Sequence, residues 1–175
     1  VIGFLDNYTV MVLTSGNAPL LAGARVETKT RADVVPVGEG LLGRVFDGAG
    51  HPLDGQDAPQ LLQQWPLRGE RVNPLRRKPV RQALDVGVRA LNGLLTVGRG
   101  QKIGIISGSG VGKSSLLSCI ARYTEAEVVV IGLIGERGRE VAGFVEELQQ
   151  HPSFAHTITV AVPADQSPVL RMRGL

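Results

Sequence analysis

The segment Lys102–Ser115 constrains this chain more than any other, because it joins an apolar run to a glycine-rich loop. It reads K-I-G-I-I-S-G-S-G-V-G-K-S-S, and residues with helical spacing follow it. Glycines allow backbone angles that are closed to other residues, so successive N–H groups can point at one anion. The start of a helix adds a partial positive charge. The pattern predicts a phosphate-binding loop between a strand and a helix, and therefore a chain that binds a nucleoside triphosphate.

Each residue type in this loop has its own expected role. Lys113 can reach the β- and γ-phosphates as a point charge, and the Ser114 hydroxyl can coordinate Mg²⁺. Ser107 departs from the usual pattern, which has its first glycine at this position. The alternative is an ordinary glycine-rich turn. The residues expected to contact the nucleotide are Gly108, Ser109, Gly110, Val111, Gly112, Lys113, Ser114 and Ser115.

Composition narrows the class of protein. The 175 residues are 43% apolar but only 4% aromatic, which is typical of α/β cores built on Val, Ile and Leu. The single cysteine, Cys119, cannot form an internal disulfide, which fits a reducing compartment. The net charge of +3 is too small to imply nucleic acid. Basic residues gather between Arg68 and Arg81. They form either an electrostatic contact with an acidic partner, a lipid surface or RNA, or a solvated linker, and the small net charge favours the linker.

Alternating helices and strands follow residue 81. Strands are expected at Lys102–Ser107, Glu127–Ile134 and Thr157–Val162. Helices are expected at Gly112–Tyr123 and around the apolar positions 141, 144, 145 and 148, with Pro152 ending the second. This order predicts a doubly wound parallel sheet, an α/β fold.

The first 80 residues have a different character. Residues 1–34 read as short strands, including a hairpin at the Leu5-Asp6-Asn7 turn and a strand at Ala24–Thr28. Residues 35–60 are rich in Gly, Pro and Asp, with a short strand possible within Leu41–Phe46. A long, extended connection without its own core is expected at about 55–80, most clearly from residue 61.

A second group of polar residues follows the expected strand Glu127–Ile134. The segment Gly135–Glu140 reads G-E-R-G-R-E and leaves the same edge of the sheet as the phosphate-binding loop. Glu136 could polarise a water that attacks the γ-phosphate, and Arg137 could bind phosphate oxygens or hold the glutamate. The alternative is a polar loop at a helix start, where acidic residues are favourable.

The longest motifs resemble one family. The runs A-E-V-V-V-I-G-L-I-G-E-R-G-R-E-V, D-V-G-V-R-A-L-N-G-L-L-T-V-G-R-G-Q-K-I-G-I and G-S-G-V-G-K-S are similar to the ATPase of the bacterial flagellar and type III protein export machinery, itself related to the catalytic subunit of rotary ATP synthases. The segments N-P-L-R-R-K-P and P-A-D-Q-S-P-V-L-R-M-R resemble the flagellar branch more closely.

The resemblance implies a domain plan. Residues 1–34 would be the last part of an N-terminal β-barrel, and residues 35–175 the first part of a P-loop (RecA-like) nucleotide-binding domain. The chain starts at Val1 and stops before the strand whose aspartate completes the Mg²⁺ site in the family. We therefore expect a piece that is not an active enzyme alone.

The resemblance also implies roles. The loop glycines and Lys113 would hold phosphates, Ser114 would bind Mg²⁺, Glu136 would be the catalytic carboxylate, and Arg137 would contact the γ-phosphate region. Lys113 would also stabilise charge during hydrolysis of ATP.

For the complete protein, the resemblance implies a homohexameric ATPase that drives protein export. Its expected partners are export-gate proteins, stalk or regulator proteins, and exported proteins or their chaperone complexes. It would be cytoplasmic and peripheral to the inner membrane, with no nucleic acid bound. Two alternatives stay open: a nucleotide-binding subunit of a rotary ATP synthase, which in its non-catalytic form would lack the carboxylate of Glu136, and a hexameric RNA translocase.

Overall fold

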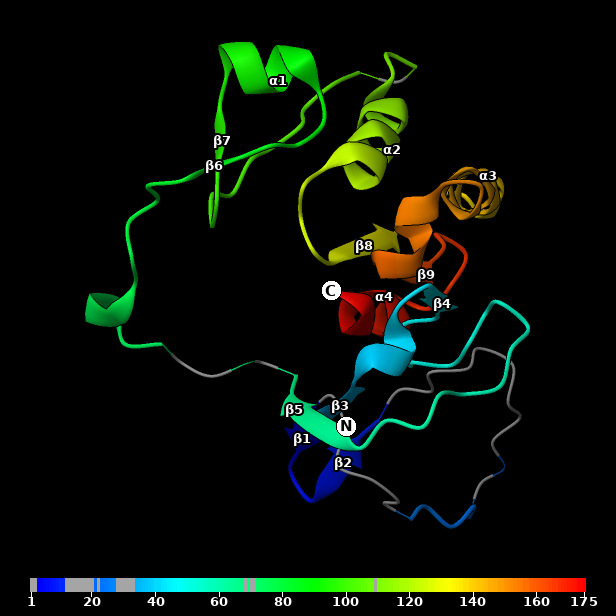
Figure 1. Cartoon of the computed structure of the whole chain (residues 1–175). Helices are drawn as coiled ribbons and strands as arrows, with labels where there is room; N and C mark the ends of the chain where they lie inside the picture. The colour runs from blue at the N-terminus through cyan, green and yellow to red at the C-terminus, as the bar shows by residue number, and fades with distance from the viewer. Residues whose placement is uncertain are drawn as a thin grey trace.

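A parallel three-stranded sheet lies at the centre of the computed structural model (Figure 1). The structure describes residues 3–11, 21, 23–27, 34–67, 69, 72–108 and 110–175. The strand order is β4 (Arg44–Phe46), β9 (Thr157–Val162), β8 (Val129–Ile134). Both pairings are parallel, with Val129 opposite Thr157 and Arg44 opposite Ile158. The predicted α/β fold with a parallel sheet is thereby confirmed, and the predicted bounds of β9 are correct.

Two helices cover one face of this sheet. They are α2 (Lys113–Tyr123) and α3 (Gly138–Gln149), which follow the loops predicted from the sequence. The α3 residues Val141, Phe144 and Leu148 recur at helical spacing and are buried in one apolar cluster. The same cluster contains Leu133 of β8, Ala161 of β9, Val45 of β4 and Ala121 of α2. Burial of this shared apolar face holds the helices against the strands.

The opposite face of the sheet is covered in part by α4 (Pro168–Gly174). Close approach there requires small residues. A Cβ at Gly174 would lie 2.7 Å from Cγ2 of Val162, and a Cβ at Gly48 would lie 2.6 Å from the carbonyl oxygen of Leu170. The helix therefore packs so closely against the end of β9 that only glycine fits at position 174. No helix in the described part of the chain is long and apolar enough to cross a bilayer.

The N-terminal part contains two antiparallel pairs. β1 (Gly3–Leu5) and β2 (Tyr8–Val10) form the predicted hairpin, with Asp6 at a φ of 50° in its turn. β3 (Val34–Val37) pairs with β5 (Gln63–Pro66), and η1 (Glu39–Leu41) lies between β3 and β4. The strand expected at Ala24–Thr28 is wrong for residues 24–27, which are not in a strand. Residue 28 lies outside the described residues.

The connection expected at residues 61–80 contains regular structure. Contrary to the prediction, its first residues form β5, which pairs with β3. Residues 72–82 are exposed and contain the short helix η2 (Pro74–Arg76). Arg76, Arg77 and Lys78 form no ion pair with the described residues.

A small unit precedes the phosphate-binding loop. β6 (Ala83–Leu84) and β7 (Val97–Gly98) pair antiparallel around the short helix α1 (Arg89–Leu94), and Figure 1 shows this unit beside α2. η3 (Pro152–His156) connects α3 to β9.

The strand predicted at Lys102–Ser107 is wrong for the described structure. Residues 101–108 have no regular secondary structure, and Ile106 is 98% exposed. A strand needs a neighbour that accepts its backbone hydrogen bonds, and no described strand lies beside this segment. The third strand of the sheet is instead β4, from the region where only a possible strand was predicted.

A buried ion pair fixes the loop after β4. The Arg44 guanidinium donates to both carboxylate oxygens of Asp54, and the two side chains are only 11% and 4% exposed. The backbone N–H groups of Val45 and Gln56 also donate to this carboxylate. The hydrogen bond from Arg44 is the largest cause that lowers the pKa of Asp54 from 3.8 to about 2.

This lowered pKa predicts how stability depends on pH. The unfolded chain binds a proton to Asp54 more readily, so the stabilisation is complete above about pH 4 and is lost as pH falls toward 2. Asp54→Asn should lower the free energy of unfolding by about 2 kcal/mol at pH 7. The difference from wild type should shrink near pH 2. Urea unfolding at both pH values measures it, with the exposed Asp165→Asn as control. A deficit that is equal at both pH values would contradict the assignment.

Candidate functional site

The phosphate-binding loop runs directly into α2. Gly110 and Gly112 have φ angles of 76° and 95°, in the left-handed region that favours glycine. Gly112 is the N-cap of α2, and its carbonyl oxygen accepts from the N–H of Leu116 at 2.9 Å. Gly108 does not have a left-handed φ, so the conformational argument made for three glycines holds for two. Ser109 lies outside the described residues.

This loop borders open space. A Cβ built on Gly108, Gly110 or Gly112 would meet no heavy atom within 4 Å. The N-terminal turn of α2 opens onto the same space, where unpaired N–H groups favour an anion. The space and the donors together fit a group of phosphate size.

The second loop is held by the end of the neighbouring strand. Gly135, with a φ of 79°, turns the chain out of β8, and its N–H donates to the carbonyl oxygen of Val162 at 2.8 Å. The carbonyl oxygen of Glu136 accepts from the N–H of Ala164 at 2.9 Å. These two bonds continue the β8–β9 pairing beyond the strands and fix the backbone beneath Glu136.

The two loops face one another across a cavity of about 700 Å³. Nζ of Lys113 lies 4.0 Å from Oε1 of Glu136, and the two side chains are 44% and 39% exposed. The packing of α2 against α3 and the sheet therefore brings together the cation and the carboxylate that the sequence singled out. The described residues that line the cavity are Ser107, Gly108, Gly110, Gly112, Lys113, Ser114, Ser115, Gly135, Glu136, Arg137 and Glu140.

Two predicted site residues behave differently from the rest. Val111 is 68% exposed and does not line the cavity. Arg137 lines it but lies 3.9 Å from Glu140 through Nη1 and Oε1, and it forms no ion pair with Glu136. Sequence reasoning treated Glu140 only as a helix-start charge. Its spacing of three residues from Arg137, about one helical turn, is the signal that could have placed it at the cavity.

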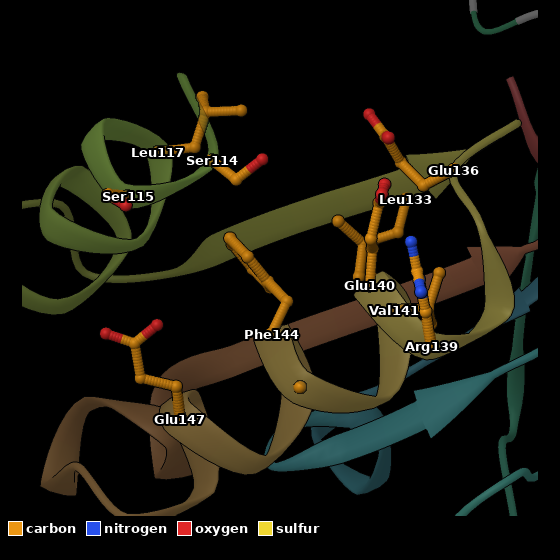
Figure 2. Close-up of a pocket in the computed structure, with 11 residues that line it drawn as sticks. Ser114, Ser115, Leu117, Leu133, Glu136, Arg139, Glu140, Val141, Phe144 and Glu147 are labelled. Atoms are coloured by element: carbon orange, nitrogen blue, oxygen red, sulfur yellow. The ribbon is translucent and has the colours of Figure 1, made fainter. Parts of the chain in front are cut away.

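A smaller groove of about 240 Å³ adjoins the site between α2 and α3 (Figure 2). Ser114 and Glu136 lie at its upper edge, on opposite sides. Leu117, Leu133 and Phe144 make its apolar wall. This packing sets the distance between the helix that carries Ser114 and the strand that leads to Glu136.

One hydroxyl side chain at this site is placed where it could bind a metal ion together with phosphate. Within the described ranges, no group of three or more His, Cys, Asp or Glu side chains is placed to hold a metal ion. Ser114 supplies one hydroxyl at the first turn of α2, beside the space for phosphate. A hydroxyl in this place fits a metal ion that is bound together with the phosphates.

Comparison with known families agrees with this geometry. The model of the ATP synthase alpha/beta family, nucleotide-binding domain, matches residues 87–175, which include both loops and half of the chain. The chain belongs to this family.

Individual relatives extend over the rest of the chain. The Flagellum-specific ATP synthase of Salmonella typhimurium is 48% identical over 99% of this chain and 40% of its own length. The protein of that name from Pseudomonas aeruginosa is 44% identical over 99% of this chain and 39% of its own.

A solved structure also matches. It is the assembled ATPase EscN in complex with its central stalk EscO, from the type III secretion system of enteropathogenic E. coli. The TM-score is 0.74 at 43% identity, over 81% of this chain and 35% of that chain. The chain thus spans about 40% of the length of the curated relatives it matches.

The cavity predicts a specific dependence of binding on Lys113. Replacing it with alanine removes the cation that faces the anion site and should weaken binding of a fluorescent ATP analogue by roughly tenfold to a hundredfold, the range for a hydrogen bond to a charged group. Lys102→Ala, also exposed but outside the cavity lining, is the control. Equal affinities for wild type and Lys113→Ala would show that the nucleotide binds elsewhere.

Proposed function

We propose that the complete protein hydrolyses ATP with Mg²⁺ as cofactor and uses the energy for protein export by a flagellar or type III machinery. The observation that carries the proposal is the placement of Lys113 and Glu136 on opposite sides of one cavity, 4.0 Å apart, above the N-terminus of α2. Phosphate binding alone needs the loop and the lysine. A carboxylate across from them adds a group that can act on water.

The residues divide the work as follows. The N–H groups of the loop and Lys113 bind the phosphate oxygens. There they stabilise the negative charge on these oxygens during phosphoryl transfer. Ser114 offers its hydroxyl to Mg²⁺, which when bound neutralises phosphate charge. Glu136 accepts a hydrogen bond from the attacking water and orients it. Arg137 is exposed and free to turn from Glu140 toward the γ-phosphate region.

The larger assembly is proposed from the relatives. EscN is described as an assembled ATPase with a central stalk, and this chain matches it at 43% identity. A homohexamer with a stalk or regulator protein at its centre, peripheral to the cytoplasmic face of the inner membrane, fits that likeness. Export-gate proteins and exported proteins, alone or with chaperones, are its proposed further partners. Residues 1–34 are proposed to belong to an N-terminal barrel and residues 35–175 to the nucleotide-binding domain.

Glu136→Gln tests the chemistry separately from binding. The substitution keeps the shape of the side chain and removes the charge that orients water, so turnover should fall by roughly a hundredfold or more while nucleotide affinity changes by less than about tenfold. Steady-state phosphate release and nucleotide titration of the complete protein measure the two effects.

Glu140→Gln is the matched control, because Glu140 lines the same cavity and faces Arg137 rather than Lys113. Its turnover should stay within about threefold of wild type, as expected for loss of an exposed ion pair. Proportional loss of affinity and turnover in Glu136→Gln would identify Glu136 as a structural residue.

Ring assembly makes a further prediction for the complete protein. If each active site is completed by a neighbouring copy, specific activity should rise steeply with protein concentration and level off when the ring is complete. Phosphate release measured beside light scattering over a dilution series tests this. Constant specific activity in a species that stays monomeric would contradict the ring.

A further inference from the structure

Ser107 adds a hydroxyl group to the cavity at a position where the usual phosphate-binding pattern has a glycine. A glycine offers only its backbone, whereas a serine side chain offers one hydrogen-bond donor and an acceptor oxygen. Ser107 is exposed and lines the same cavity as Lys113 and Glu136. Its φ angle is not positive, so the backbone at this position does not require glycine. The chain therefore carries a polar side chain in its phosphate site that the pattern does not contain.

The hydroxyl of Ser107 forms a weak hydrogen bond in the structure. Its Oγ donates to the carbonyl oxygen of Gly108, the next residue, at 3.2 Å, and both groups are exposed. Hydrogen bonds from a hydroxyl to an oxygen usually span about 2.5 to 3.0 Å. A phosphate oxygen is negatively charged and accepts a shorter and stronger bond than a carbonyl oxygen does. Exchange of the carbonyl for a phosphate oxygen is therefore favourable.

The place of Ser107 beside the phosphate site depends on the local chain. Ser107 is joined directly to Gly108, which lines the same cavity. The loop then passes through Gly110 to Gly112, the N-cap of α2. A hydrogen bond from residue 107 to an anion in this loop therefore requires only the short segment from residue 107 to the first turn of the helix.

The other polar groups of the loop leave room for such a donor. Lys113 supplies a positive charge, the loop supplies backbone N–H groups, and Ser114 is the residue proposed to bind the metal ion. Each phosphate oxygen has more than one lone pair and can accept more than one hydrogen bond. A donor from Ser107 therefore adds to these contacts and does not replace one of them.

We propose that Ser107 is a further phosphate-binding residue: its hydroxyl turns away from Gly108 and donates a hydrogen bond to a phosphate oxygen of the bound nucleotide. The inference rests on the proposed function and deepens it, because it names a contact that the phosphate-binding pattern lacks. The ligand is recognised through its phosphate groups and not through its base. Since the hydroxyl acts on the phosphate itself, its contribution does not depend on the metal ion.

Ser107→Ala in the complete protein is the main test, because it removes the hydroxyl and keeps the Cβ. The dissociation constant of a fluorescent, non-hydrolysable ATP analogue should rise roughly threefold to tenfold, the range for loss of one hydrogen bond. The factor should be the same in Mg²⁺ and in EDTA. Inorganic pyrophosphate, which shares only the phosphate groups, should compete less well by the same factor. Ser107→Thr, which keeps a hydroxyl on the Cβ, should restore most of the affinity.

Ser153→Ala is the matched control. Ser153 also has a hydroxyl in a hydrogen bond, with Nδ1 of His151 at 2.9 Å, but it lies in η3 and does not line the cavity. This variant should bind both ligands as wild type does. Lys113→Ala is measured alongside, and equal binding by Lys113→Ala and wild type would overturn the proposed site together with this inference.

Four results would overturn the role of Ser107 while Lys113→Ala still binds weakly. The first is wild-type affinity in Ser107→Ala. The second is a loss of affinity only in Mg²⁺, because the hydroxyl would then act on the metal ion. The third is a loss for the ATP analogue but not for pyrophosphate, because the hydroxyl would then contact the base or the sugar. The fourth is a loss that Ser107→Thr does not restore, because the hydroxyl would then not be its cause.

Discussion

The parallel pairing of β8 and β9 is the interaction on which the rest of the site depends. Parallel strands bring their carboxyl ends to one edge, and the loops that leave this edge can share a ligand. Here the pairing continues past the strands, because Gly135 and Glu136 bond to Val162 and Ala164. The backbone that carries the carboxylate is thus fixed by the β8–β9 pairing, and the apolar residues of α3 pack against these two strands.

Local sequence patterns correctly predicted the elements whose structure depends on residues close together in the sequence. The glycine and lysine pattern gives the loop and start of α2, and the apolar spacing from Val141 to Leu148 gives the buried face of α3. The sequence also predicted that Glu136 lies beside the loop, and the two do share a cavity, although in the described structure the packing of α2 rather than a strand before the loop places Lys113 there. Residues 157–162 alternate and are bounded by turns, so their strand was also recognisable.

The errors came where structure depends on a distant partner. Lys102–Ser107 has the composition of a strand, but a strand forms only when another segment accepts its hydrogen bonds. β4 pairs with β9, more than 100 residues away. The three residues of β4 alone do not predict this pairing. Gly87 is a similar case: its sequence suggests a turn, and only the contact with Tyr123 explains why the position is glycine.

The pair of Lys113 and Glu136 contributes little to holding these parts together. Both side chains are more than a third exposed and 4.0 Å apart, and ion pairs of this kind stabilise proteins only weakly. Their distance must therefore be set by other contacts: by β9 and its following loop for the glutamate, and by the packing of α2 for the lysine. Lys113 and Glu136 interact only weakly with each other, and each is held in place by other contacts. A ligand can therefore bind between the two side chains without disturbing the fold. This property suits a site that binds an anion between its two loops.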